Sequence, residues 1–279
     1  MLPNPFGSGL RAAVSRRSLF IVALVLTPLT GMRAQEHEED HDDDHLHFSQ
    51  PIVTESPSPD TKIRLDYIGS RTRGSTGVDE NTFRLEGEYS FTHSVSLAIV
   101  TPFISRTAPP TNRASGLGNI EVSLKAASLA FGEHGLLLGG GLSAALPTGS
   151  DAKGIGSGHI VELEPFLDAG YKRSALELVG FAILSTTFHR RAGEEAERNL
   201  TFNFSTLYRI QSRLEGLIEL NTTRALIGPD SGSQQTFVAP GFKVYPFTNR
   251  KIMFGASLEL GTGAVRDTHA LLLSGFYHF

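Results

Sequence analysis

The chain has 279 residues, a formal net charge of −4 at pH 7, and neither cysteine nor tryptophan. Without cysteine it forms no disulfide and carries no lipid anchor on an N-terminal cysteine. The slightly acidic balance offers no basic surface for a nucleic acid, and no segment after residue 34 reaches the roughly 18 apolar residues of a transmembrane helix.

Residues 1–34 have the composition of a secretory signal peptide. Four arginines and no acidic residue flank Leu19–Leu29, an apolar run too short to cross a bilayer as a helix. We expect cleavage after Ala34 and export of the rest of the chain.

Residues 35–48 form an acidic tail rich in histidine. His37, His41, His45 and His47 stand among seven carboxylates, and this charge density predicts disorder. Imidazoles beside carboxylates suit weak capture of a divalent metal such as Zn, Cu, Ni or Co. A solvated tail without a ligand explains the pattern equally well, and no other cofactor is predicted.

Residues 49–60 contain three prolines and predict an extended linker. The remaining body, 61–279, alternates apolar and polar residues, as strands with two different faces do. In Asn81–Phe91, for example, Phe83 and Leu85 share one parity while Arg84 and Glu86 share the other. The sequence predicts twelve strands in this body: 61–69, 81–91, 95–104, 118–129, 135–146, 159–170, 175–187, 199–210, 213–223, 235–246, 251–261 and 268–279.

The predicted connections alternate between long polar loops and tight turns. An even strand number with this alternation is the layout of an antiparallel transmembrane β-barrel of the bacterial outer membrane, with both termini and the tail in the periplasm. The last strand ends on Tyr277 and Phe279, which resemble the signal recognised by the barrel-assembly machinery. We therefore expect a twelve-stranded barrel in contact with outer-membrane lipid.

The charged parity of each strand is expected to face the lumen. It carries six cations and eleven carboxylates, among them Arg64, Arg84, Glu86, Glu162, Glu164, Arg209 and Glu219. An excess of carboxylates would favour cations in a narrow pore, whereas pairing between neighbouring strands would instead tie the barrel together. Five apolar residues share this parity and form either an apolar wall or simple filling: Phe166, Val179, Phe181, Ile183 and Phe237. Twelve strands lie between the roughly eight of barrels filled by side chains and the roughly sixteen of open channels, so the strand number is compatible with both an open and a filled lumen.

Sequence signatures of catalysis are absent. Gly154–Gly158 reads GIGSG, with glycine where a nucleophile elbow has serine. There is also no phosphate loop and no H-E-x-x-H motif. We expect no enzyme, with a lipid-modifying barrel that uses a Ser–His pair as the alternative.

Three segments of the body and the terminal Tyr277–Phe279 are familiar together: Gly116–Ala127, Leu146–Asp151 and Gly156–Tyr171. They resemble the outer-membrane transporter-like family named for the MetA pathway of phenol degradation, although Asn119 stands where that pattern has Asp. The resemblance implies a barrel that passes aromatic or other hydrophobic compounds, and it supplies no catalytic residues. The leading hypothesis is an outer-membrane channel for a small solute. The alternative in the same membrane is a metal-homeostasis component that uses the tail.

Overall fold

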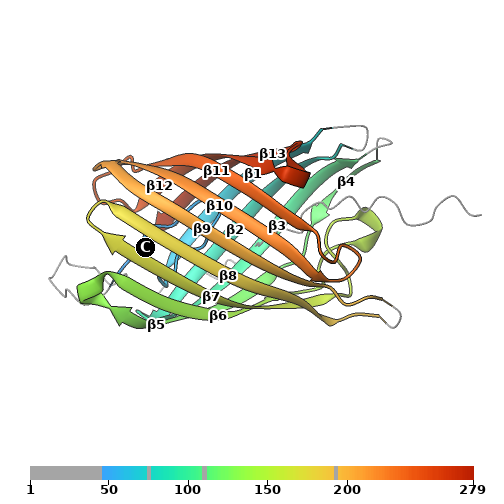
Figure 1. Cartoon of the computed structure of the whole chain (residues 1–279), viewed down its shortest axis with the longest axis horizontal. Helices are drawn as coiled ribbons and strands as arrows, with labels where there is room; N and C mark the ends of the chain where they lie inside the picture. Colours follow the sequence, from blue (N-terminus) through green and yellow to red (C-terminus); the bar gives the residue numbers. More distant parts are fainter. Residues whose placement is uncertain (1–45, 74–76, 109–111, 192–193) are drawn as a thin grey trace, which may run out of the picture.

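The computed structural model describes residues 46–73, 77–108, 112–191 and 194–279. Most of them belong to one antiparallel sheet that closes on itself as a barrel (Figure 1). Its strands are β1 (Lys62–Thr72), β2 (Asp79–Thr92), β3 (Val95–Ala108), β4 (Asn112–Leu117), β5 (Glu121–Phe131), β6 (Leu136–Ala145), β7 (Val161–Arg173), β8 (Leu176–His189), β9 (Arg198–Gln211), β10 (Leu214–Ile227), β11 (Gln234–Val244), β12 (Ile252–Thr262) and β13 (Thr268–His278). No helix in the described ranges is long and apolar enough to cross a membrane.

Consecutive strands pair with each other except β4 and β5, and β1 closes the barrel against β13. The closing ladder runs without interruption from Lys62 opposite His278 to Thr72 opposite Thr268. Both β4 and β5 pair with β3, so they share one place in the wall. The barrel therefore has the twelve positions that the sequence predicts, and the ends of the twelve predicted strands are shifted by four residues or fewer.

The short strand β4 lies within a predicted loop. It pairs with the far end of β3, beyond a break in the wall where the Gly118 amide donates to the Pro102 carbonyl at 2.9 Å. A Cβ at Gly118 would lie 2.4 Å from Pro102 Cγ, so the chain passes this point closely only because residue 118 is glycine. This close passage separates β4 from β5.

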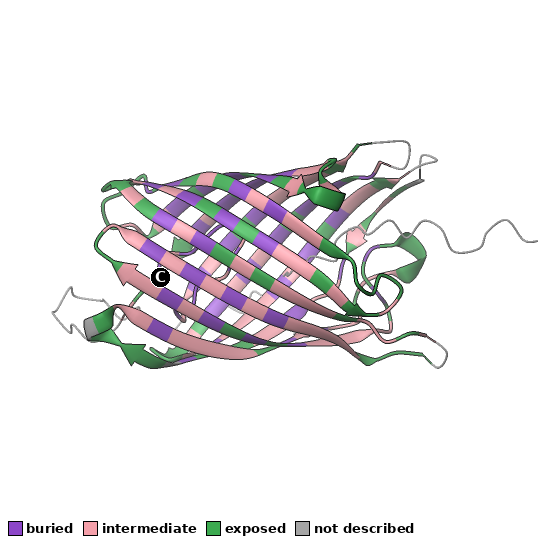
Figure 2. Ribbon diagram, in the orientation of Figure 1, coloured by how far each residue is buried: buried purple, intermediate pink, exposed green. Residues whose placement is uncertain are grey.

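Side chains alternate between the two faces of the wall, as Figure 2 shows by bands of buried and exposed residues. Large apolar side chains are exposed on the outside, for example Leu65, Leu167 and Phe254. Charged side chains of the other parity, such as Lys62 and Glu86, are buried inside. An apolar outer face over a polar interior is the arrangement of a barrel that stands in lipid.

The segment before β1, residues 46–60, contains the end of the tail predicted to be disordered and the predicted extended linker, and both of these parts are ordered inside the barrel. Residues 46–60 form no helix or strand, as their prolines suggest, but they enter the barrel from the end that carries the tight turns. Phe48, Ile52 and Thr54 are at most 1% exposed, and Phe48 and Ile52 pack with Val179 and Leu272 of the wall. We call residues 46–60 the plug. Charge density in the preceding tail does not prevent burial here, because the wall supplies partners for the plug backbone.

Candidate functional site: the barrel interior

The charged residues expected in the lumen are distributed unevenly. Arg64, Arg84, Glu86, Glu164 and Glu219 are buried inside the barrel. Glu162 and Arg209 lie near the two ends of the wall, and both are partly exposed. Most of the buried charges face the plug or one another and do not line an open pore.

Buried carboxylates of the wall accept hydrogen bonds from the plug backbone. Glu219 on β10 accepts from the backbone amides of Ile52, Val53 and Thr54 at 2.9–3.2 Å, and from the Ser205 hydroxyl at 2.8 Å. Glu177 accepts from the Ser49 amide at 2.8 Å. A carboxylate that satisfies several buried amides at once is a strong anchor.

Buried cations of the wall make the complementary contacts with plug carbonyls. Lys243 donates to the Gln50 carbonyl at 3.1 Å, and Lys125 donates to the Ser56 carbonyl at 2.9 Å. Arg64 donates to the Ile52 carbonyl, and its guanidinium lies over the Phe276 ring. The wall therefore holds the plug mainly through backbone atoms, which no pattern of plug side chains reveals.

One plug side chain joins an ionic network on β1, β2 and β5. Glu55 lies 3.2 Å from Arg84 Nη2 and 3.7 Å from Arg64 Nη1. Both arginines also pair with Asp66, at 2.9 and 3.3 Å. The ion pairs continue through Glu86, Lys62, Glu88 and Lys125. The pairing predicted between neighbouring strands is therefore present, for example between Lys62 and Glu86, and Glu55 of the plug adds a further partner to it.

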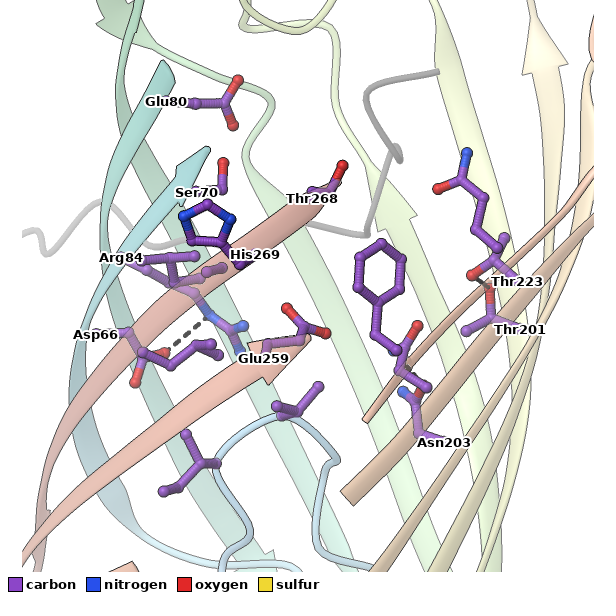
Figure 3. A pocket seen from close by; sticks show the side chains of 18 of the residues that line it. Asp66, Ser70, Glu80, Arg84, Thr201, Asn203, Thr223, Glu259, Thr268 and His269 are labelled. Atoms are coloured by element: carbon purple, nitrogen blue, oxygen red, sulfur yellow. Dashed lines mark hydrogen bonds and ion pairs between the residues drawn. The ribbon is translucent and has the colours of Figure 1, made fainter. Parts of the chain in front are cut away.

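A deep cavity lies between the plug and the end with the long loops (Figure 3). It holds about 1360 Å³ of unfilled space, counted with the solvent at its open mouth. The plug residues Ile52, Val53 and Glu55 form its floor. The wall is divided by chemistry. Apolar side chains come from β8 and β11 (Phe181, Ile183, Phe237), amides and hydroxyls from β9 and β10 (Thr201, Asn203, Asn221, Thr223), and charges from β1, β2 and β12 (Arg64, Asp66, Glu80, Arg84, Glu259).

The apolar wall corresponds to residues singled out in the sequence. Phe166 and Phe181 stack with ring centroids 4.8 Å apart and pack with Ile183. Phe181 and Ile183 line both the deep cavity and a smaller one beside it. Val179 packs with the plug instead. The lumen therefore contains an apolar surface next to a charged one.

The entrance of the plug is fastened by a histidine and an aspartate. His47 Nε2 lies 2.8 Å from Asp60 Oδ1, and His278 Nδ1 lies 4.0 Å from the other oxygen of Asp60. The Asp60 carboxylate raises the pKa of His47 above its usual value. Burial alone would raise the pKa of Asp60, but the charge and hydrogen bond of His47 together with the charges of Lys62 and His278 outweigh burial and hold this pKa well below its usual range.

The metal prediction falls largely on undescribed residues. His37, His41 and His45 lie outside the described ranges, and His47 pairs with Asp60. Among the described residues, no group of three histidine, aspartate or glutamate side chains is arranged to hold a metal ion. Metal binding at the tail stays a prediction.

Loops at the far end of the barrel meet at His159. Its Nδ1 contacts Asp151 at 2.9 Å and its Nε2 contacts Glu194 at 2.8 Å. The Gly158 amide lowers the pKa of Asp151 to about 2. The Ser157 hydroxyl oxygen lies 3.3 Å from the same Nδ1, beside the Asp151 contact.

Asn119 organises the same loops, a role that sequence reasoning missed. Its side-chain oxygen accepts from the Ser157 amide at 2.7 Å and from the Gly149 amide at 3.2 Å. A carboxylate oxygen could accept the same two bonds, which explains how the expected Asp and the observed Asn fit one position.

At the opposite end of the barrel, Tyr277 and Phe279, the residues predicted to form the assembly signal, are exposed on the outer face with their ring centroids 4.9 Å apart.

Comparisons with known proteins identify the architecture. No family model matches the sequence, and no curated protein is significantly similar to it. An outer-membrane channel from Pseudomonas putida F1 superposes with a TM-score of 0.62 at 17% identity, over 87% of this chain and all of that chain. This chain has the fold of an outer-membrane β-barrel.

Two further solved structures share the fold. The NanC porin superposes with a TM-score of 0.52 at 10% identity, over 77% of this chain and all of that chain. The translocator domain of the autotransporter NalP from Neisseria meningitidis gives 0.50 at 12% identity, over 78% and 87% of the two chains. At such identities the barrel alone is shared, so the function must be argued from the interior.

Proposed function

We propose that this protein is an outer-membrane channel for a small solute with an apolar or aromatic surface, and that its plug closes it at rest. The observation that carries the proposal is a deep cavity, open at the long-loop end and floored by the plug. A solute enters from the open end, and passage requires the plug to move.

The chemistry of the cavity supports a solute that is partly apolar. Phe181, Ile183 and Phe237 give it one apolar side, while amides and hydroxyls face them from β9 and β10. Ligand sites of this kind combine apolar surface with a few placed polar groups. A hydrophilic ion would find the path closed by Phe48 and Ile52, which are almost completely buried between the walls.

The outer face supports a location in the outer membrane. Apolar side chains such as Leu220 on β10, Leu258 on β12 and Leu273 on β13 are more than 40% exposed. Exposed apolar surface on this scale is unfavourable in water but not in lipid. The tight-turn end, where the chain ends and the plug enters, would face the periplasm.

A reversible cross-link tests whether plug movement opens the channel. The Thr54 and Ser205 hydroxyl oxygens are 2.6 Å apart, both side chains are fully buried, and the chain has no native cysteine. We expect the double variant Thr54→Cys/Ser205→Cys to block solute uptake into liposomes when oxidised and to restore it when reduced. Each single-cysteine variant should be insensitive to reductant. Uptake unchanged by the oxidised bond would overturn the proposal.

Deletion gives the complementary test. A chain without residues 46–60 should show large, steady single-channel conductance, because the plug backbone no longer fills the lumen. A chain without residues 35–45 keeps the plug and should behave like the parent chain in the absence of metal. A closed barrel after removal of the plug, with heat-modifiable migration that shows folding, would contradict the proposed role.

A second candidate function is regulation by a divalent metal at the tail. The observation that favours it is the contact between the two ends of the plug, Asp60 and His47, which is the last of the four histidines predicted to bind metal. Metal on the tail would then be coupled to plug position. Zn²⁺ should alter conductance of the parent chain but not of the chain without residues 35–45, and an equal effect on both would rule this role out.

A further inference from the structure

Glu55 is held to the wall more loosely than the plug backbone. Its two ion pairs measure 3.2 and 3.7 Å, and 22% of its side chain is exposed to the cavity. Glu219, which anchors the neighbouring backbone, is 1% exposed and accepts several hydrogen bonds of 2.8–3.2 Å. Because a partly solvated ion pair is weak, another anion in the cavity can replace Glu55 as the partner of Arg64 and Arg84.

Arg64 has a buried donor that Glu55 does not satisfy. Its Nε donates to Asp66 at 2.9 Å and its Nη2 donates to the Ile52 carbonyl. Its Nη1 is buried and makes no hydrogen bond, since the Glu55 oxygen paired with it is 3.7 Å away. A buried charged donor without an acceptor is costly. A mobile carboxylate is free to approach to hydrogen-bond distance, whereas Glu55 is restrained by the fold of the plug.

Apolar surface lies in the same cavity as these two arginines. Phe181 and Ile183 on β8 and Phe237 on β11 line it together with Arg64 and Arg84. Figure 3 shows Asp66 and Arg84 on one side of the cavity, Asn203 and Thr201 on the other, and Glu259 between them. A ligand that spans the cavity therefore meets two arginines set among carboxylates at one end and apolar or neutral polar groups at the other.

We propose that the cavity binds amphipathic monocarboxylates, whose carboxylate replaces Glu55 at Arg64 and Arg84. The proposal rests on the proposed channel function and names the solute class. The planar guanidinium groups suit a carboxylate, which accepts two parallel hydrogen bonds, and the apolar body of the ligand covers Phe181 and Phe237. Glu80 and Glu259 also line the cavity, so a second negative charge on the ligand is disfavoured.

Displacement of Glu55 links binding to opening. Glu55 shares its arginine partners with Asp66 and Glu86. Once a ligand carboxylate takes its place, Glu55 remains near these like charges without its compensating cations, which destabilises the seated plug. The solute thereby weakens the contact that closes its own path.

Isothermal titration calorimetry of the refolded chain, with its plug intact in detergent micelles, tests the proposal. The probes are benzoate, its neutral analogue benzyl alcohol and the dianion phthalate, each corrected by titration into empty micelles. We expect benzoate to bind at least tenfold more tightly than either of the others. Glu55→Gln should tighten benzoate binding about tenfold, because it removes the competing charge, and should leave benzyl alcohol within twofold of the parent value.

Two variants complete the design. Arg84→Gln should weaken benzoate binding at least tenfold, and Asp230→Asn, which removes a charge from an exposed loop, should change nothing. Should Arg84→Gln fail to fold, the Glu55→Gln comparison decides. Equal binding of benzoate and benzyl alcohol without an effect of Glu55 would overturn the carboxylate site and leave the channel itself standing. Absence of benzoate binding would overturn the site as well, whereas the channel is judged by the Thr54–Ser205 cross-link.

Discussion

Glu219 offers the sharpest test of how the plug is held. Its carboxylate accepts the backbone amides of Ile52, Val53 and Thr54 and the Ser205 hydroxyl, all in a buried site. In Glu219→Gln only one side-chain oxygen remains to accept hydrogen bonds. The new NH₂ group is itself a donor, so it cannot accept from the plug amides that faced the lost oxygen. One or two buried N–H groups then lose their acceptor.

The magnitude follows from the number of donors that lose a partner. Each buried unsatisfied donor costs about 1–3 kcal/mol, so the seated plug should be destabilised by roughly 2–4 kcal/mol. Because each 1.4 kcal/mol changes an equilibrium constant tenfold, the population with the plug released should rise roughly 30- to 700-fold. The barrel itself should remain folded, because the ladder hydrogen bonds of β10 join backbone atoms that the substitution leaves in place.

Single-channel recording in planar bilayers measures this change as open probability. A matched control is Glu121→Gln on β5, since Glu121 is also buried and makes no described hydrogen bond to the plug. Protease cleavage within the plug should accelerate in parallel for Glu219→Gln alone. An unchanged open probability in Glu219→Gln, or an equal rise in both variants, would refute the view that this carboxylate anchors the plug.

Three further predictions concern the wall, the plug contact and pH. Leu258→Arg places a charge on the exposed outer face of β12 and should lower the free energy of unfolding in lipid vesicles by about 2–4 kcal/mol. Denaturant titration checks this, and no loss would contradict a lipid-facing β12. Gly170→Ala puts a Cβ 2.7 Å from the Phe48 ring and should therefore raise open probability. The second change Phe48→Ala in the same chain should relieve the clash. An open probability of Gly170→Ala equal to that of the parent would show that Phe48 does not lie against residue 170. Because Asp60 raises the pKa of His47, their pair stabilises the seated plug below about pH 6.5 and loses this effect as pH rises through the higher value. Open probability should therefore rise with pH in the parent chain but not in His47→Gln, and a pH response that survives in the variant would assign it elsewhere.

The barrel wall was predictable because its signal is local. A strand between lipid and a polar lumen must alternate apolar and polar side chains. This alternation predicts both the strand and its two faces in the run Phe83, Arg84, Leu85 and Glu86. The closure between β1 and β13 followed from the strand count and the loop lengths. Strand β4 was missed, since it depends on the close approach of Gly118 to Pro102, which is not a local pattern.

The plug was not predictable from its own residues. Its prolines and polar side chains give no periodicity, and its anchors are backbone atoms that every sequence shares. The partners that decide its position are Glu177, Glu219 and Lys243, more than a hundred residues away along the chain. The same charges, read strand by strand, suggested a cation path or simple cross-strand pairs.

The sequence by itself thus determined a membrane barrel with a charged interior, because successive side chains of each strand face lipid and lumen in turn and their polarity follows that alternation. Only the tertiary structure decided that residues 46–60 lie inside the barrel. The position of residues 46–60 depends on which buried charges of the wall make hydrogen bonds with their amides and carbonyls. These charges come together only when the whole barrel closes.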